Sequence, residues 1–141
     1  MSTAEFNNVT ELDVQNLRAL VELQRAHFRA EGEVSHATRV DRLKRLKALI
    51  VENKTAFAST TKREYGNARS YEFSLFSEYA SKVEAIDYSI KHLKDWMKPV
   101  SRKTNTPMNL LGGKSQVKYF PKGVVGIISP WNLPFGLTVA P

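Results

Sequence analysis

The chain has 141 residues, of which 42% are hydrophobic and 25% charged, an ordinary globular composition with room for one domain and its core. It contains no cysteine, which excludes disulfides, thiolate metal sites and a cysteine nucleophile within these residues. No apolar run approaches the roughly 20 residues of a membrane span, and the first eight residues lack the pattern of a signal peptide. A soluble, cytoplasmic protein is therefore the default expectation.

The net charge of +7 is the one unusual bulk property. A basic surface can bind nucleic acid or an acidic partner, so a basic helical interaction module is the alternative function. The simpler interpretation of this charge is that the cationic residues over 39–47 form the solvent-exposed face of an amphipathic helix. They recur at helical spacing, and no aromatic side chains interleave with them. We therefore expect no nucleic-acid partner.

A first helix is predicted from Val9 to about Ala30. Thr10 can cap its start, and Gly32 after the last turn is a typical stop. Its apolar face would be formed by Leu17, Leu20, Val21 and Phe28.

A second helix is predicted to begin near Ser35. Asn53 can cap a continuation of it, and Gly66 is well placed as its C-terminal stop. The residues expected to point inward are Val40, Leu43, Leu46, Leu49 and Ile50.

The longest predicted helix runs from Ser70 to Met97. Pro99 ends it, because the residue before a proline is pushed out of the helical region. Glu78, Glu84 and Asp87 are interpreted as a solvated face of this helix, in preference to paired catalytic carboxylates. The residues expected to point inward are Phe73, Phe76 or Ser77, Ala80, Val83, Ile86, Ile90, Leu93 and Met97.

The last forty residues change in character. An irregular arm is predicted over 100–115 and a strand over 116–120. A short β-branched apolar run over 124–128, bounded by Gly123 and Pro130, predicts a buried strand. Pro130 and Pro134 then bracket a turn, and a helix is predicted to start at about Phe135. Helices followed by strands indicate an α+β or an incomplete α/β domain.

The stretch Gly123-Val-Val-Gly126-Ile-Ile-Ser129-Pro130-Trp131-Asn132-Leu133-Pro134 resembles the strand-turn-helix signature of the aldehyde dehydrogenase superfamily. Gln24-Arg-Ala-His-Phe28, and Lys91-His-Leu93 with Trp96-Met97 and Pro99, are similar to the coniferyl-aldehyde dehydrogenase branch. The resemblance runs from about Gln24 to Pro141.

The resemblance implies an incomplete α/β fold, in which N-terminal helices and the first strands belong to a Rossmann-type cofactor-binding domain. Residues 1–141 would be the N-terminal part of that single region. Its helices would cover about 9–98, its arm and strands about 100–129, and its turn and helix start 130–141. Later residues would build most of the parallel sheet.

The resembled enzymes oxidise an aldehyde to a carboxylic acid with NAD or NADP as the acceptor. The reaction needs a thiolate nucleophile, hydride transfer and a carboxylate-activated water. Because this chain has no cysteine, we expect an N-terminal fragment that is inactive alone and whose partner is the remainder of the enzyme chain. The full-length enzyme is expected to form a homo-oligomer, and coniferyl-type aldehydes are one candidate substrate class.

Asn132 is the candidate catalytic residue. An attacked aldehyde develops negative charge on its oxygen, and one fixed amide donor can contribute about 10²–10³ in rate. Asn132 matches the family position whose side chain helps to form the oxyanion hole. The alternative is that Asn132 merely caps or precedes the following helix, a position that asparagine favours.

The residues that precede Asn132 match positions lining the groove of the nicotinamide cofactor: Ile128, Ser129, Pro130 and Trp131. The alternative for Trp131 is a buried packing residue. Leu133 falls where many relatives carry an aromatic residue on the wall of the substrate tunnel, so this departure leaves a preference for aromatic substrates open. The histidines at 27, 36 and 92 are scattered and predict no metal site.

Overall fold

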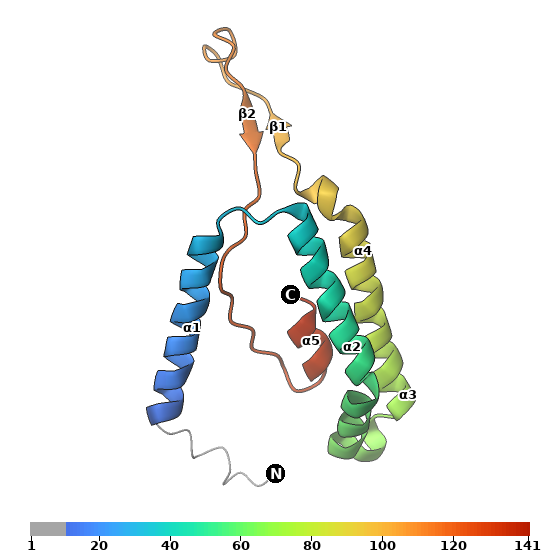
Figure 1. The fold of residues 1–141 in the computed structure, drawn as a ribbon. Coiled ribbons are helices and arrows are strands. Elements are labelled where there is room, and N and C mark those ends of the chain that lie inside the picture. Colours follow the sequence, from blue (N-terminus) through green and yellow to red (C-terminus); the bar gives the residue numbers. More distant parts are fainter. Residues whose placement is uncertain (1–10) are drawn as a thin grey trace. The chain divides into compact units, whose positions relative to one another are not determined.

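A computed structural model describes residues 11–141 (Figure 1). The chain divides into two compact units, which are described separately. The described part of the first unit is residues 11–34 and 121–126, and the second unit is residues 35–120 and 127–141. All of the candidate site residues belong to the second unit.

The first unit contains helix α1, Glu11–Glu31. This confirms the first predicted helix, although its predicted cap at Thr10 lies outside the described residues. Of the predicted apolar face, Leu17 and Leu20 are exposed, with 61% and 51% of their surface accessible. Phe28 is half-buried and lies against Gly123, whose φ of 96° favours glycine.

Helix α2, His36–Tyr65, begins the second unit. Ser35 caps it by accepting a hydrogen bond from the Thr38 amide at 3.1 Å, and Gly66 ends it with a φ of 56°, so both predicted ends are confirmed. The predicted cap at Asn53 is wrong. Its side chain is inside one continuous helix and donates to the Leu49 carbonyl at 2.8 Å.

The predicted long helix is present but is not uniformly α-helical. It consists of α3 (Tyr71–Ser74), the π-helical turn η3 (Leu75–Ala80) and α4 (Ser81–Trp96). Ser70 caps it, accepting from the Phe73 amide at 3.0 Å. A π turn holds more residues than an α turn, so it shifts the inward face of the helix.

That shift explains where the predicted face of this helix was wrong. Phe73 and Phe76 are exposed, whereas Ser74, Glu78 and Tyr79 are buried. Glu78, interpreted from the sequence as solvated, is completely buried.

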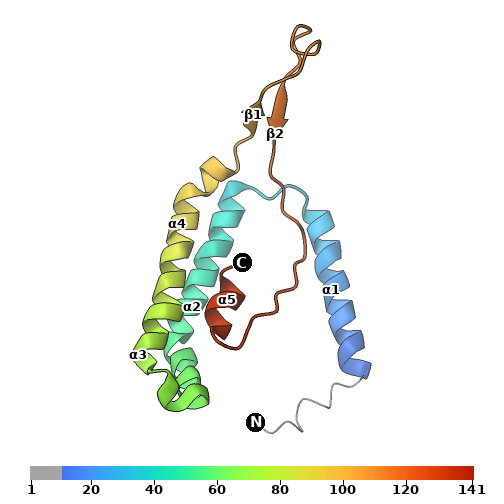
Figure 2. The ribbon, with the colours of Figure 1, turned by 180° about the vertical axis from the view of Figure 1, so that it is seen from behind.

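Helices α2 and α4 lie side by side, and α5 (Pro134–Val139) packs beside them (Figures 1 and 2). The buried cluster between them is Ile50, Ala58, Tyr79 and Ile86. Partly buried residues from all three helices surround it, with Phe135 and Val139 contributed by α5. Leu49, predicted to point inward, is 56% exposed. Burying a side chain such as Ile50 stabilises the fold by about 1.5–3 kcal/mol.

The sheet of the described residues has two short antiparallel strands, β1 (Val100–Arg102) and β2 (Ser115–Val117), with Val100 opposite Val117. β2 overlaps the strand predicted at 116–120, while β1 was not predicted. The described structure is mostly helical, which is consistent with an incomplete α/β fold.

The buried strand predicted over 124–128 is wrong for this structure. No strand is assigned there, and Ile128 is fully exposed. A strand forms only where a neighbouring backbone accepts and donates its ladder hydrogen bonds, and the described residues supply no such neighbour to this segment.

Within residues 11–141, no helix combines the length and apolar character that crossing a membrane requires.

Because of Tyr79, the stability of this core falls at alkaline pH. Its burial raises the pKa of the phenol above the usual 10.0, Thr61 partly offsets the rise and the Glu78 carboxylate adds to it. The folded chain therefore holds the phenol proton more tightly than the unfolded chain. The stability that this difference contributes is fully present below about pH 10 and is lost as the pH rises through the raised pKa.

We expect Tyr79→Phe to lose less stability than the unsubstituted chain between about pH 8 and about pH 11. Urea unfolding across this range is the measurement. Tyr88→Phe is the control, because Tyr88 is 58% exposed. Parallel stability curves for Tyr79→Phe and the unsubstituted chain would show that the phenol does not contribute.

Candidate functional site

The turn that carries Asn132 leads into helix α5, in which Pro134 occupies the first position as predicted. Asn132 is exposed, and its carboxamide has no hydrogen-bond partner among residues 11–141. The N-cap of α5 is Leu133, without a side-chain bond. Asn132 therefore precedes this helix without capping it, so only the capping part of the alternative interpretation is wrong.

Arg69 lies just before Ser70, the residue that caps α3, and contacts this turn from there. Its Nη1 donates to Glu78 Oε1 at 2.9 Å, and its Nη2 donates to the backbone carbonyl of Asn132. The guanidinium lies over the rings of Tyr65, at 4.6 Å from the centroid, and Phe73, at 5.7 Å. Arg69 thus joins an ion pair, the turn and two aromatic rings.

Glu78 occupies the centre of this arrangement. Its side chain is 0% exposed and that of Arg69 is 14% exposed, so their ion pair is buried. Glu78 Oε2 accepts from the backbone amides of Phe135 and Gly136, each at 3.2 Å. First-turn amides have no partner within their own helix. A carboxylate from η3 therefore supplies the acceptor that the sequence around α5 lacks.

Trp131 is held through its backbone and not through its ring. The Tyr65 hydroxyl donates to the Trp131 carbonyl, while 83% of the Trp131 surface is exposed. Trp131 is therefore not a buried packing residue among the described residues, which argues against the packing alternative.

The other predicted site residues frame the same turn. The hydroxyls of Ser129 and Thr138 are hydrogen-bonded at 2.9 Å, which joins the incoming segment to α5. Ile128 and Pro130 are exposed and Leu133 is half-buried. The structure thus brings all six predicted residues into one turn and its approach.

An aromatic cluster fixes α5 against the long helices. The ring of Phe135 lies 4.4 Å from that of Tyr79 and 4.9 Å from that of Phe57 between centroids. Such pairs contribute about 0.5–1.5 kcal/mol each beyond their buried area. The turn before α5 is therefore attached to the core immediately after Asn132.

Arg69 and Glu78 were not predicted from the sequence to belong to this site. Glu78 lies four residues before Lys82, and such a pair of opposite charges is typical of the solvent-exposed face of a helix. The π turn moves Glu78 inward instead. The one available signal was that α5 has a proline start but no Ser, Thr, Asp or Asn immediately before it.

The residues before Asn132 were predicted to line the nicotinamide cofactor. Ile128 and Trp131 offer exposed apolar surface, and no backbone hydrogen bond within the described chain occupies 127–130. The chain has no glycine-rich phosphate loop at a strand-to-helix turn that could hold the diphosphate. Within residues 11–141, no three His, Asp or Glu side chains gather as metal ligands.

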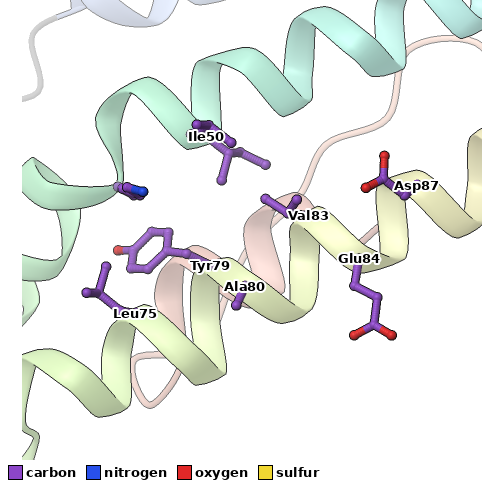
Figure 3. A pocket seen from close by; sticks show the side chains of 9 residues that line it. Ile50, Leu75, Tyr79, Ala80, Val83, Glu84 and Asp87 are labelled. Atoms are coloured by element: carbon purple, nitrogen blue, oxygen red, sulfur yellow. The ribbon is translucent and has the colours of Figure 1, made fainter.

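A pocket of about 500 Å³ lies between α2 and the η3–α4 run. Its walls include Ile50, Leu75 and Val83, and Figure 3 shows Asp87 directed toward α2 and Glu84 away from it. The Asp87 carboxylate is already bonded to Lys47 at 2.6 Å. None of the predicted site residues lines this hollow, so it is separate from the Asn132 turn.

The sequence that forms this turn and the helices around it matches a known family. The sequence model of the aldehyde dehydrogenase family matches residues 2–140. The chain therefore belongs to the aldehyde dehydrogenase family, which confirms the resemblance drawn from the Gly123–Pro134 stretch.

Individual relatives agree with this assignment. The chain is 39% identical over 118 residues to a probable coniferyl aldehyde dehydrogenase of Caulobacter vibrioides, covering 82% of this chain and 24% of that protein. It is 36% identical over 123 residues to the coniferyl aldehyde dehydrogenase of a Pseudomonas strain, covering 87% and 24%. It is 32% identical over 131 residues to the mouse dimeric NADP-preferring aldehyde dehydrogenase, covering 91% and 27%. The chain thus spans about a quarter of the length of these relatives.

Removing one member of the buried ion pair should lower the stability of the fold strongly. We expect Glu78→Ala to lower the free energy of unfolding by about 3–5 kcal/mol, because it leaves the Arg69 charge buried without its partner. Urea unfolding of the chain measures this loss.

Asp95→Ala is the matched control, since the Asp95–Lys98 pair is exposed on both sides and should leave the midpoint unchanged. Equal effects of the two substitutions would contradict a special role for the buried pair.

Proposed function

We propose that this chain supplies the oxyanion donor and part of the cofactor wall of an NAD- or NADP-dependent aldehyde dehydrogenase that oxidises an aldehyde to a carboxylic acid. It would form the N-terminal part of the cofactor-binding region, with a Rossmann-type sheet completed by other residues. The observation that supports this most is the Asn132 carboxamide, which has no partner within the described chain and stands on a turn fixed by hydrogen bonds on both sides.

Asn132 would act on the reacting oxygen. When a nucleophile attacks the aldehyde carbon, negative charge develops on the carbonyl oxygen, and the Asn132 Nδ2–H group would donate to it. A primary amide does not titrate near neutral pH, so the donor would be present throughout the working range. A preorganised donor also needs no reorientation as the charge forms.

The residues before Asn132 would line the nicotinamide side of the cofactor, which accepts a hydride when it is bound. Ile128 and Trp131 would exclude water with their apolar surfaces, and Ser129 and Pro130 would set the path of the backbone. Leu133 would form part of the substrate wall. The names of two relatives favour a coniferyl-type aldehyde as the substrate class.

The nucleophile would come from outside these 141 residues, because they contain no cysteine. We therefore propose that the chain alone has no turnover, that its partner is the remainder of the enzyme, and that the complete enzyme is a homo-oligomer. The mouse relative, named as dimeric, supports that last point.

The alternative function, a basic interaction module, gains no support from the structure. Arg45 pairs with Asp41 at 3.4 Å and Lys47 with Asp87 at 2.6 Å. Arg39 and Arg42 also have partners. The cationic stretch of α2 is therefore partly neutralised by neighbouring groups.

A chimera tests the assigned role of Asn132. The segment of the Pseudomonas coniferyl aldehyde dehydrogenase that aligns with this chain is replaced by this chain, and NADH or NADPH formation is followed with coniferyl aldehyde. We expect Asn132→Ala to lower kcat by about 10²–10³ while cofactor binding is retained.

Asn109→Ala, in the β1–β2 loop, is the matched control and should leave kcat unchanged. A folded, cofactor-binding chimera whose turnover does not change with Asn132→Ala would remove the proposed role.

A further inference from the structure

We propose that Arg69 and Glu78 are positioning residues for Asn132, and that their buried ion pair fixes the direction of its Cα–Cβ bond. This inference rests on the proposed function, because it concerns how the proposed oxyanion donor is held. Neither side chain would touch substrate or cofactor; both would act through the backbone of the turn.

The two peptide groups on either side of Asn132 are each tied to a side chain. A peptide group is planar, so the direction of a Cα–Cβ bond is set by the two planes that flank it. The carbonyl of Trp131, in the plane before Asn132, accepts from the Tyr65 hydroxyl. The carbonyl of Asn132, in the plane after it, accepts from Arg69. With both planes held, the Cα–Cβ bond of Asn132 has one direction.

The guanidinium of Arg69 is itself immobilised. Its two Nη atoms serve different partners, Glu78 on one side and the Asn132 carbonyl on the other. The rings of Tyr65 and Phe73 lie against it, and only 14% of the side chain is exposed. A planar fork with several donors suits this double contact, whereas a lysine ammonium would act as a point charge.

Glu78 extends the same constraint beyond Asn132. One carboxylate oxygen holds Arg69 and the other holds the amides of Phe135 and Gly136. Hydrogen bonds to an ionised carboxylate are about twice as strong as neutral ones. The turn is therefore fixed at Asn132 and again three and four residues later.

This anchoring matters because the Asn132 carboxamide has no partner of its own within the described chain. The starting direction of its side chain, along the Cα–Cβ bond, is therefore set by the backbone alone. Oxyanion donors act at about 2.7–3.1 Å from the developing charge, and a misplacement of about 1 Å can cost about 10²-fold in rate. A turn free to move would leave Asn132 present but ineffective.

The anchoring is tested first on the 141-residue chain, by amide hydrogen exchange. The variant Arg69→Met with Glu78→Leu replaces the buried pair with apolar side chains of similar size, a change that is often neutral for stability. We expect the amides of Phe135 and Gly136 to exchange at least about 10-fold faster, since their acceptor is gone. The Leu137 amide, bonded to the Leu133 carbonyl at 3.1 Å, reports whether α5 itself persists.

The matched control is Lys98→Met with Asp95→Leu, which removes an exposed ion pair and should leave those two amides unchanged. Glu78→Gln, which keeps the side-chain shape, should also accelerate their exchange if the double variant fails to fold. Unchanged protection at Phe135 and Gly136 in a folded variant would overturn the proposal.

The catalytic consequence is tested in the chimera by a double-mutant cycle. We expect Arg69→Met with Glu78→Leu to lower kcat by about 10–100-fold with little change in KM. In the Asn132→Ala background the same pair should cause no further loss, because the pair acts through Asn132. Equal losses in both backgrounds would show a merely structural role and overturn the proposal. If Asn132→Ala alone leaves kcat unchanged, the proposed function is wrong, and the exchange experiment still decides whether the pair anchors the turn.

Discussion

The buried ion pair between Arg69 and Glu78 is the interaction on which the turn that carries Asn132 depends. Removing a carboxylate and a guanidinium from water costs several kcal/mol per ion, and their attraction offsets this only when the remaining polar atoms are also bonded. Here both Glu78 oxygens and two Arg69 nitrogens are used, and the bonds reach the Asn132 turn and the first turn of α5. The hydrogen bonds that offset the desolvation of these two charges also connect helices distant in sequence to the candidate catalytic residue.

The π turn η3 is what makes this ion pair possible. It moves Glu78 and Tyr79 together into the space between α2 and α5, so that an acidic and an aromatic side chain share the interior. Tyr79 then packs on Phe135 and anchors α5 by apolar contact, while Glu78 anchors the same helix by hydrogen bonds. Single-turn π segments often occur at functional sites, and here Glu78 contacts the start of α5, which lies within the residues that the aldehyde dehydrogenase family model matches.

Local chemistry explains which parts of this fold were predictable from sequence. The helix starts near Ser35 and Ser70, the stop at Gly66 and the proline start of α5 depend on neighbouring residues only, and all four are confirmed. The strand expected over 124–128 depends on a backbone partner that the described chain does not supply. Burial of Glu78 depends on a π turn, and no residue pattern in the sequence predicts that turn. Asn132 was identified through family resemblance, and its catalytic role stays a prediction.

We expect Asn132 to stand on a rigid turn, with a carboxamide that no other group of the described chain occupies. The backbone order parameter of Asn132, obtained from ¹⁵N relaxation of the chain, tests this most directly. We expect a value of about 0.85, which is that of a rigid backbone. A value below about 0.6 would mark a flexible turn and would contradict the claim that Arg69 and Glu78 hold it.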